Sequence, residues 1–249
     1  MAPSRRSPLL KIEWAKKHIS DLDRAIRAFC DSEPYTLGIK EYPDIAHVGL
    51  YVVKVQPVPD AIALGIGDAV HNMRSAFDHL AWQLVEAGGG IPNRSTYFPI
   101  CKTPEQYASA IGQGEIDKMR PGTEKLLRYI QPYESGDDTL WNIHTLDRMD
   151  KHRLILTVTM VLNAWIFPIQ PAWEVKFDST FREPLEEGQE IFRTPASSYH
   201  SEKYKDMKLG LDVTFGQSEV VAGKPVLETL NGMADLADTL IRKFEPFLI

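Results

Sequence analysis

Residues 67–85, GDAVHNMRSAFDHLAWQLV, concentrate side chains that can do chemistry on one predicted helix. The stretch holds two histidines, two aspartates and one arginine, and it contains no lysine. An exposed helix face normally collects Lys and Glu, because these side chains are readily solvated and favour helix. At about 100° per residue, four side chains fall on one face: His71, Ser75, Asp78 and Trp82. This composition predicts a buried or cleft-lining position.

A second predicted helix, over residues 138–152, repeats the pattern. The polar residues on or beside one of its faces are His144, Asp147, Arg148, Lys151 and His152. Neither face carries the coat of Lys and Glu expected of an exposed one, so we expect the two faces to pack within side-chain reach of each other. Histidines and carboxylates from both helices would then converge. Converging titratable groups form acid/base and metal sites, so the pair of helices predicts a functional site.

The candidate site residues form two groups. The first group brings a guanidinium, a carboxylate and imidazoles to helical contact spacings, which is typical of catalysis. Its members are Arg74, His79, Asp78 and His71. The second group is a candidate for binding and comprises Asn72, Trp82, His144, Asp147, Lys151, His152 and Arg153.

A purely structural role is the alternative for these residues. Asp78 with Arg74, and Asp147 or Asp150 with Lys151 or Arg153, would then be intrahelical ion pairs, and His79 an interior imidazole with its hydrogen bonds satisfied. Trp82 and Trp141 would be core aromatic residues, which is the commoner role of tryptophan. The coincidence of two such helices favours the functional interpretation.

The composition limits the classes of function. The chain has 249 residues, 43% of them apolar, and a formal net charge of −6, so a nucleic-acid site would have to be a local patch. Cys30 and Cys101 fit no metal or disulfide spacing, which suits a reducing compartment. The N-terminal stretch has no apolar core of a signal peptide, and no apolar run is long enough to span a membrane. We therefore expect a cytoplasmic protein that does not bind membranes.

Hydrophobic periodicity places the elements that must position the candidate residues. Apolar residues spaced by three and four, such as the stripe through Met73 and Phe77, predict helices that bury one face, and runs of β-branched and aromatic residues predict strands. The expected helices cover residues 8–30, 60–87, 123–131, 138–152 and 226–246, with a shorter one that begins at Pro104. The expected strands cover residues 47–56, 154–162, 165–169, 173–178 and 209–215, with a turn at Asn163. Residues 180–208 are rich in charged residues, and we expect them to form a surface loop with at most one short strand.

These elements predict an α+β fold, in which a helical bundle carries a small, mainly antiparallel sheet. We expect one domain over residues 1–249. Residues 8–153 form its mainly helical part and residues 154–224 its sheet-rich part. Residues 226–249 form a C-terminal helix that packs back on the bundle.

Several motifs resemble those of a bacterial protein family. IGDAVHNMRSAFDHLAWQL, FPI, QPY, LW and LDRMDKHR occur in this order within roughly residues 62–156. They are similar to the motif series of a widespread uncharacterised family found in many actinobacteria. The ordered set is fairly specific, and the resemblance implies no activity.

Arg74, four intervening residues and His79 also resemble the Arg-x4-6-His signature of HEPN domains, which are helical and often act as metal-independent ribonucleases in toxin and antiviral systems. HEPN sites often carry Asn, Asp or His directly after the arginine, where this chain has Ser75. The resemblance implies that His79 is the base for a ribose 2′-hydroxyl and that Arg74 stabilises charge on the phosphate, with Asp78 or His71 orienting them. It also implies RNA as the partner, a homodimer as the assembly, and neither metal nor cofactor.

Two other functions stay open. A metal-dependent or small-molecule enzyme would use histidines and aspartates of both helices, although no HExxH or Glu-x-x-His pattern is present. A non-catalytic binding module would use the same polar residues to fix the register of its helices. The distance between His79 and His152, together with a metal ion or a second subunit found there, would separate these possibilities.

Overall fold

The computed structural model describes residues 6–113, 118–152, 158–169, 172–177, 184–199 and 207–248. This part of the chain is a mixed α+β fold of six α-helices and two small antiparallel sheets, with three short 3-10 turns. The helices are α1 (Ser7–Asp31), α2 (Asp60–Ala87), α3 (Pro104–Gln113), α4 (Thr123–Ile130), α5 (Asp138–His152) and α7 (Val226–Phe244). The strands are β1 (Tyr35–Tyr42), β2 (His47–Val55), β3 (Val158–Ile169), β4 (Ala172–Phe177), β5 (Glu190–Pro195) and β6 (Lys208–Phe215).

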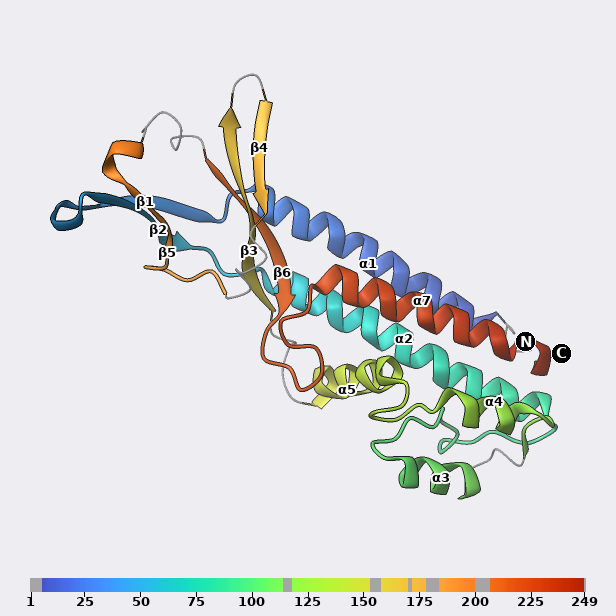
Figure 1. Cartoon of the computed structure of the whole chain (residues 1–249). Helices are drawn as coiled ribbons and strands as arrows, with labels where there is room; N and C mark the ends of the chain where they lie inside the picture. The colour runs from blue at the N-terminus through green and yellow to red at the C-terminus, as the bar shows by residue number, and fades with distance from the viewer. Residues whose placement is uncertain are drawn as a thin grey trace.

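Three long helices form the centre of the molecule (Figure 1). α1 runs toward the sheets, and α2 and α7 run back beside it (Figure 1). Their apolar stripes meet in one core, where Ile66, Phe77 and Phe244 are fully buried. Gly65 allows α1 to come close, since a Cβ atom there would lie 2.8 Å from a methyl carbon of Leu22. The predicted return of the C-terminal helix to the bundle is therefore confirmed.

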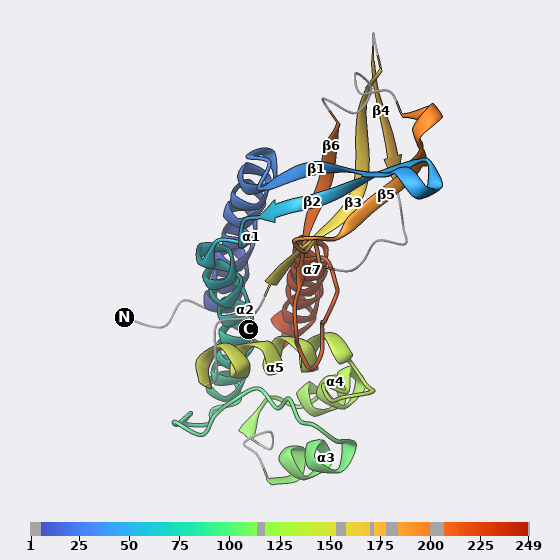
Figure 2. The ribbon, with the colours of Figure 1, turned by 90° about the vertical axis from the view of Figure 1, so that its left-hand side faces the viewer.

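α5 packs across α2 and also contacts α7. A glycine again sets the approach, because a Cβ atom at Gly67 of α2 would lie 2.5 Å from Oδ1 of Asp150 on α5. A larger residue at position 67 would have to displace the Asp150 carboxylate from this contact. The sheets and the α3–α4 segment lie at opposite ends of the helical layer (Figures 1 and 2). α2 spans the distance between them, so its C-terminal half lies near the α3–α4 end.

The strands form two sheets of three, in the orders β1-β2-β5 and β4-β3-β6. All of the pairings are antiparallel. The predicted turn at Asn163 is wrong, because β3 runs without interruption through this position and only its register with β6 shifts between Leu162 and Ala164. A bulge bends a strand without ending it, which explains how one polar residue fits within the strand.

Two strands lie where we predict no strand or at most one short strand. β1 precedes the predicted strand at residues 47–56 and pairs with it as a hairpin. β5 lies inside residues 180–208, the predicted surface loop, and pairs with β2. The predicted helices agree with α1 to α5 and α7 to within a few residues. Residues 154–157 and 178, which were included in predicted strands, lie outside the described residues.

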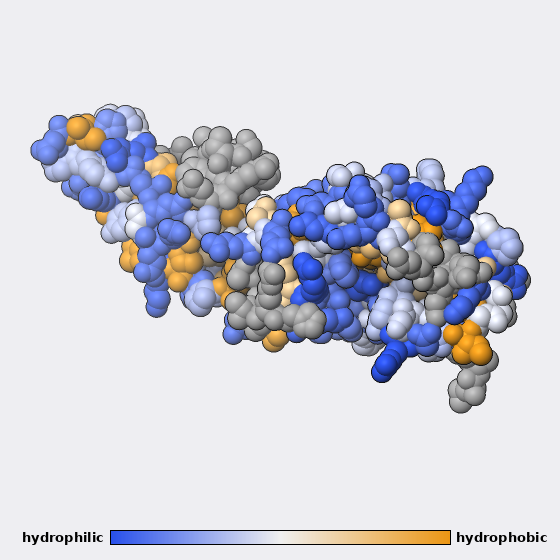
Figure 3. All heavy atoms as spheres, turned by 90° about the horizontal axis from the view of Figure 1, so that it is seen from below, coloured by the Kyte–Doolittle hydropathy of each residue, from blue (hydrophilic) through white to orange (hydrophobic). Residues whose placement is uncertain are grey.

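The surface is largely hydrophilic on the face seen in Figure 3, with hydrophobic groups in separate areas. Cys30 and Cys101 are free thiols. None of the described helices combines the length and the apolar character needed to cross a bilayer.

Candidate functional site

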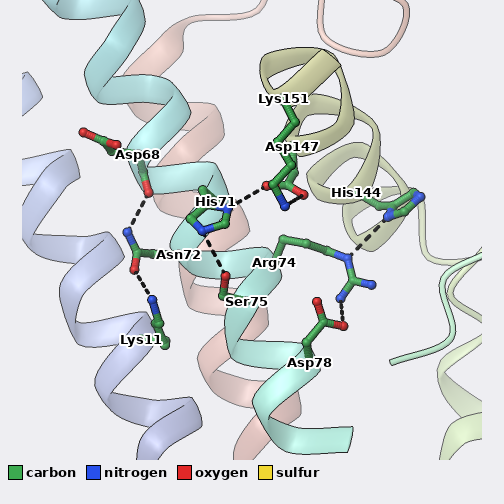
Figure 4. Close-up of polar contacts among 10 residues, drawn as sticks. All are labelled: Lys11, Asp68, His71, Asn72, Arg74, Ser75, Asp78, His144, Asp147 and Lys151. Carbon is green, nitrogen blue, oxygen red and sulfur yellow. Dashed lines mark hydrogen bonds and ion pairs between the residues drawn. The ribbon is translucent and has the colours of Figure 1, made fainter. Parts of the chain in front are cut away.

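The polar faces of α2 and α5 contact each other, as predicted. His71 of α2 lies with Nδ1 3.0 Å from Oδ1 of Asp147 on α5. One turn along, Arg74 donates from Nε to Nδ1 of His144 over 3.3 Å. Figure 4 shows both contacts bridging the two helices. The histidines at 71 and 144 therefore belong to one inter-helix cluster.

Arg74 is the centre of this cluster. Its side chain is 7% exposed, and Nη1 donates to Oδ1 of Asp78 over 2.6 Å (Figure 4). Nη2 donates to the backbone carbonyl of Phe98 over 3.3 Å, while the Phe98 amide donates to the same Asp78 oxygen over 3.2 Å. A buried guanidinium needs such partners, because an unpaired buried charge is strongly destabilising. The predicted Arg74–Asp78 ion pair is confirmed, and it also fixes the segment that contains Phe98.

A cavity of about 570 Å³ opens beside Arg74, and we name it the α2–α5 cavity. Its charged and imidazole side chains are Arg74 and Asp78 of α2 and His144, Asp147, Arg148 and Lys151 of α5. Residues 95–101 of the loop after α2 form most of another wall. The volume is in the range of pockets that hold small ligands.

His144 is held neutral in this cavity. Burial, with the nearby Arg74 and Arg148 charges as further causes, lowers its pKa to about 4. Because Arg74 can only donate, Nδ1 of His144 must accept, and the ring hydrogen is assigned to Nε2. His144 is therefore a hydrogen-bond donor at neutral pH.

Asp147 is 6% exposed and accepts from two directions. Oδ1 faces His71, and Oδ2 accepts from Nζ of Lys151 over 2.7 Å (Figure 4). His71 also contacts the Ser75 hydroxyl over 3.3 Å. Both carboxylate oxygens of Asp147 are thus engaged, so this residue positions its neighbours.

His79 faces a different cavity from Arg74. Its Nδ1 is hydrogen-bonded to the Ser7 hydroxyl at the start of α1. It lines a cavity of about 370 Å³ together with Ser7, Trp82, Asn93 and Arg94, which we name the α1–α2 cavity. Positions 74 and 79 are about 140° apart around a helix, so the two side chains point in different directions. Burial and the charge of Lys11 lower the pKa of His79.

Asp78 lies between the two cavities. Asp78, Thr96 and Tyr97 line both of them. Burial raises the pKa of the Asp78 carboxyl, an effect that Arg74 opposes. The structure thus places the expected catalytic pair on two sides of one shared wall.

The remaining predicted residues lie in other places. Asn72 accepts from Nζ of Lys11 over 3.1 Å and donates to the carbonyl of Asp68, so it faces α1 (Figure 4). Trp82 is 39% exposed in the α1–α2 cavity, and so it is not a core residue, whereas Trp141 is 7% exposed. Arg153 and the side chain of His152 lie outside the described residues.

In the described part of the chain, these residues are not arranged as the ligands of a metal ion. No group of three His, Cys, Asp or Glu side chains there is arranged to hold a metal ion. His71 and His144, which both lie in the inter-helix cluster, already bind Asp147 and Arg74 through Nδ1.

Residues 93–98 were not among the predicted site residues. Their hydrogen bonds use backbone groups on at least one side, as in the bond from the Ser95 backbone amide to Oδ1 of the Asn93 side chain over 2.8 Å. The sequence signal was the FPI motif, which begins at Phe98. A backbone carbonyl that caps a buried arginine has no signature in residue type.

Comparisons with models of protein families, with curated proteins and with solved structures found no match to this chain.

Proposed function

We propose that this chain binds RNA at the α2–α5 cavity and cleaves it without a metal ion. The observation that carries the proposal is the setting of Arg74, a buried guanidinium fixed by Asp78 and the Phe98 carbonyl at the wall of a cavity. A planar array of N–H donors suits phosphate oxygens. The HEPN-like signature at Arg74 and His79 supports the same function.

Cations exceed carboxylates around the cavity, although the chain has a net charge of −6. Arg74, Arg148 and Lys151 line it with only two aspartates. Arg148 is exposed, and no carboxylate of the described residues forms an ion pair with it. The local excess of positive charge favours an anionic ligand, and Arg148 is the cation most available to it.

The donors left for a phosphate can be counted. Arg74 has five N–H groups and uses three of them on His144, Asp78 and Phe98. Two remain for the ligand. Nε2–H of neutral His144 adds a further donor. These groups would stabilise negative charge on the phosphate as it grows in the transition state.

His79 is the general base in this proposal. Its lowered pKa keeps the ring neutral near pH 7, as a base requires. When Nδ1–H donates to Ser7, the lone pair lies on Nε2 and can accept the proton of a ribose 2′-hydroxyl. The 2′-oxygen then bonds to the adjacent phosphorus while the bond to the 5′-oxygen breaks, and that oxygen takes a proton from water. The product ends in a 2′,3′-cyclic phosphate.

A second candidate is RNA binding without cleavage. The observation that favours it is the bond from Arg74 to His144, which occupies the imidazole lone pair nearest the proposed phosphate. The two aspartates that line the α2–α5 cavity are paired with Arg74 and Lys151. If His79 does not act as the base, none of the charged residues named for this cavity is available to accept the proton. The experiment on cleavage separates the two candidates.

The test is incubation of single-stranded RNA with the protein in EDTA, followed by analysis of the new ends. We expect cyclic phosphate ends, and a rate at least about 100-fold lower for His79→Ala and Arg148→Ala. His18→Ala, a histidine of α1 outside both cavities, is the matched control. If RNA binds and stays intact, only the second candidate, binding without cleavage, is supported. If RNA neither binds nor is cut, both candidate functions are overturned.

A homodimer in the cytoplasm belongs to the same proposal. In HEPN-like nucleases two copies of the helix commonly share one site, and the signature here lies on α2. Sedimentation of the protein should give a mass of two chains. A single chain that still cleaves RNA would show that one copy holds the whole site.

A further inference from the structure

We propose that the α1–α2 cavity is a nucleobase subsite for the ligand whose phosphate lies in the α2–α5 cavity. The inference rests on the proposed function and adds to it the part of the ligand that a phosphate site cannot recognise. A flat heterocycle with hydrogen-bonding edges is the chemistry that fits this second cavity. The phosphate cavity alone would bind any phosphorylated sugar.

The two cavities are neighbours. Asp78, Thr96 and Tyr97 line both of them, so these three side chains stand between one cavity and the next. A ligand that places a phosphate beside Arg74 can therefore place its next group beside His79. In a nucleotide the group joined to the phosphate through the sugar is the base.

The aromatic residues of the α1–α2 cavity are exposed. Trp82 is 39% and Tyr97 61% exposed, and both line the cavity. The indole N–H of Trp82 donates to Glu86 over 3.0 Å, which fixes one edge of the ring. Every base can stack on an aromatic face, and such stacking is the usual basis for binding single-stranded nucleic acid.

Polar groups stand around these rings. Ser7 and His79 come from the helical side of the cavity, and Asn93 and Arg94 come from the loop. Of these, Arg94 offers a guanidinium to the edge of a base, while His79 stays the proposed general base with Ser7 as its partner. A purely apolar partner would remove these polar groups from water, which disfavours a hydrophobic ligand or protein helix here.

The wall that carries Tyr97 is fixed before any ligand binds. The Phe98 amide and carbonyl are held by Asp78 and Arg74, and the Asn93 amide donates to the Thr96 hydroxyl over 3.0 Å. The segment between these anchors is only a few residues long. Little ordering of the loop is then needed on binding, which favours affinity.

The experiment compares adenosine 5′-monophosphate with ribose 5-phosphate by calorimetric titration at low salt. We expect the nucleotide to bind about tenfold more tightly or better, because stacking adds to the phosphate contacts. Trp82→Ala should remove that advantage and leave ribose 5-phosphate binding unchanged. Trp82→Phe keeps a ring and should restore most of it. Trp82→Ala should also weaken binding of a single-stranded adenosine octamer, if the natural source of the base is RNA.

Two results would overturn the inference. If the nucleotide binds no better than ribose 5-phosphate, the α1–α2 cavity does not hold the base, although the phosphate site stands. If Trp82→Ala weakens both ligands equally, the ring acts on the phosphate site. Failure of ribose 5-phosphate itself to bind would instead contradict the proposed function. An octamer unaffected by Trp82→Ala, with the mononucleotide weakened, would assign the subsite to free nucleotides.

Discussion

The two cavities on either side of Asp78 use different kinds of side chain. The α2–α5 cavity is lined by ion-paired charges from two helices, and its aspartates are held by Arg74, His71 and Lys151. The α1–α2 cavity is lined mostly by neutral polar groups and two exposed rings, with Arg94 and the shared Asp78 as its charged side chains. α2 forms part of both cavities, because Arg74 points toward α5 and His79 points toward α1.

The difference shows what each cavity can discriminate. Fixed charges recognise an anion wherever it comes from, whereas rings and neutral polar groups recognise the shape of an uncharged group. Asp78 belongs to both cavities and holds Arg74 in place. A change in its ion pair should therefore affect the charged cavity first and the aromatic cavity through the Phe98 segment.

The largest expected effect lies in the core beneath both cavities. Phe77 is fully buried, and its ring centre lies 5.0 Å from that of Phe98. Phe77→Ala should lower the free energy of unfolding by about 3–5 kcal/mol. The half-exposed Trp82→Ala is the control and should cost less than about 1 kcal/mol. Thermal melts that give equal, small shifts would mean that α2 presents a different face to the core.

Asp78→Ala tests the shared wall. It leaves the buried Arg74 without its carboxylate and the Phe98 amide without its acceptor, so we expect a loss of about 2–3 kcal/mol in urea unfolding. Asp68→Ala, at an exposed position of the same helix, controls for the change in helix propensity and should shift stability by less than about 0.5 kcal/mol. Similar losses in both variants would deny Asp78 its positioning role.

His144 of the α2–α5 cavity should make the free energy of unfolding depend on pH. The folded pKa of His144 is about 4, below the ordinary value of 6.5, so as the pH falls from 6.5 to 4 the unfolded chain gains a proton that the folded chain does not. Stability falls over this window, by on the order of 2 kcal/mol after allowance for solvent screening. Above pH 6.5 this histidine contributes no pH dependence.

His144→Gln should remove that part of the slope when both proteins are unfolded in urea at several pH values. The raised pKa of Asp78 acts in the opposite direction, because the folded state then binds its proton first, and it remains in both proteins. An unchanged slope in the variant would mean that His144 is not the group held neutral.

The smallest effects compare the two serine–histidine contacts of α2. Ser7→Ala removes the hydroxyl that binds His79 in the α1–α2 cavity and should cost about 0.5–1.5 kcal/mol. Ser75→Ala removes the longer contact to His71, at 3.3 Å beside the charged cavity, and should cost less. Melting curves that give the reverse order would show that Ser7 is not fixed to α2.

Periodicity predicted the elements that carry the site because burial on one helix face constrains residue type. The stripe through Met73 and Phe77 fixed which face of α2 enters the core, and both residues are fully buried. The lack of Lys and Glu on the opposite face correctly predicted contact with α5. The same reasoning missed β1, where the burial pattern along Tyr35–Tyr42 does not alternate clearly.

The division into two cavities was not predicted. The motif groups Arg74 with His79 by their spacing, yet residues five positions apart on a helix point in directions about 140° apart. The loop of residues 93–98 uses backbone groups to hold Arg74, and such contacts depend on tertiary position. Asn72 shows the opposite case, a polar residue in the same stretch that binds Lys11 of α1 and lines neither cavity.

The most direct measurement of the central claim is the affinity of a fluorescent single-stranded RNA for the Arg148→Ala variant over a range of salt concentrations. Arg148 is exposed and lines the α2–α5 cavity, so its loss should leave the melting temperature unchanged. We predict weaker binding than wild type and a salt dependence reduced by about one phosphate contact. Arg128→Ala, an exposed arginine of α4 paired with Glu124, should bind like wild type. Equal affinity and equal salt dependence for all three proteins would contradict an RNA phosphate in the α2–α5 cavity.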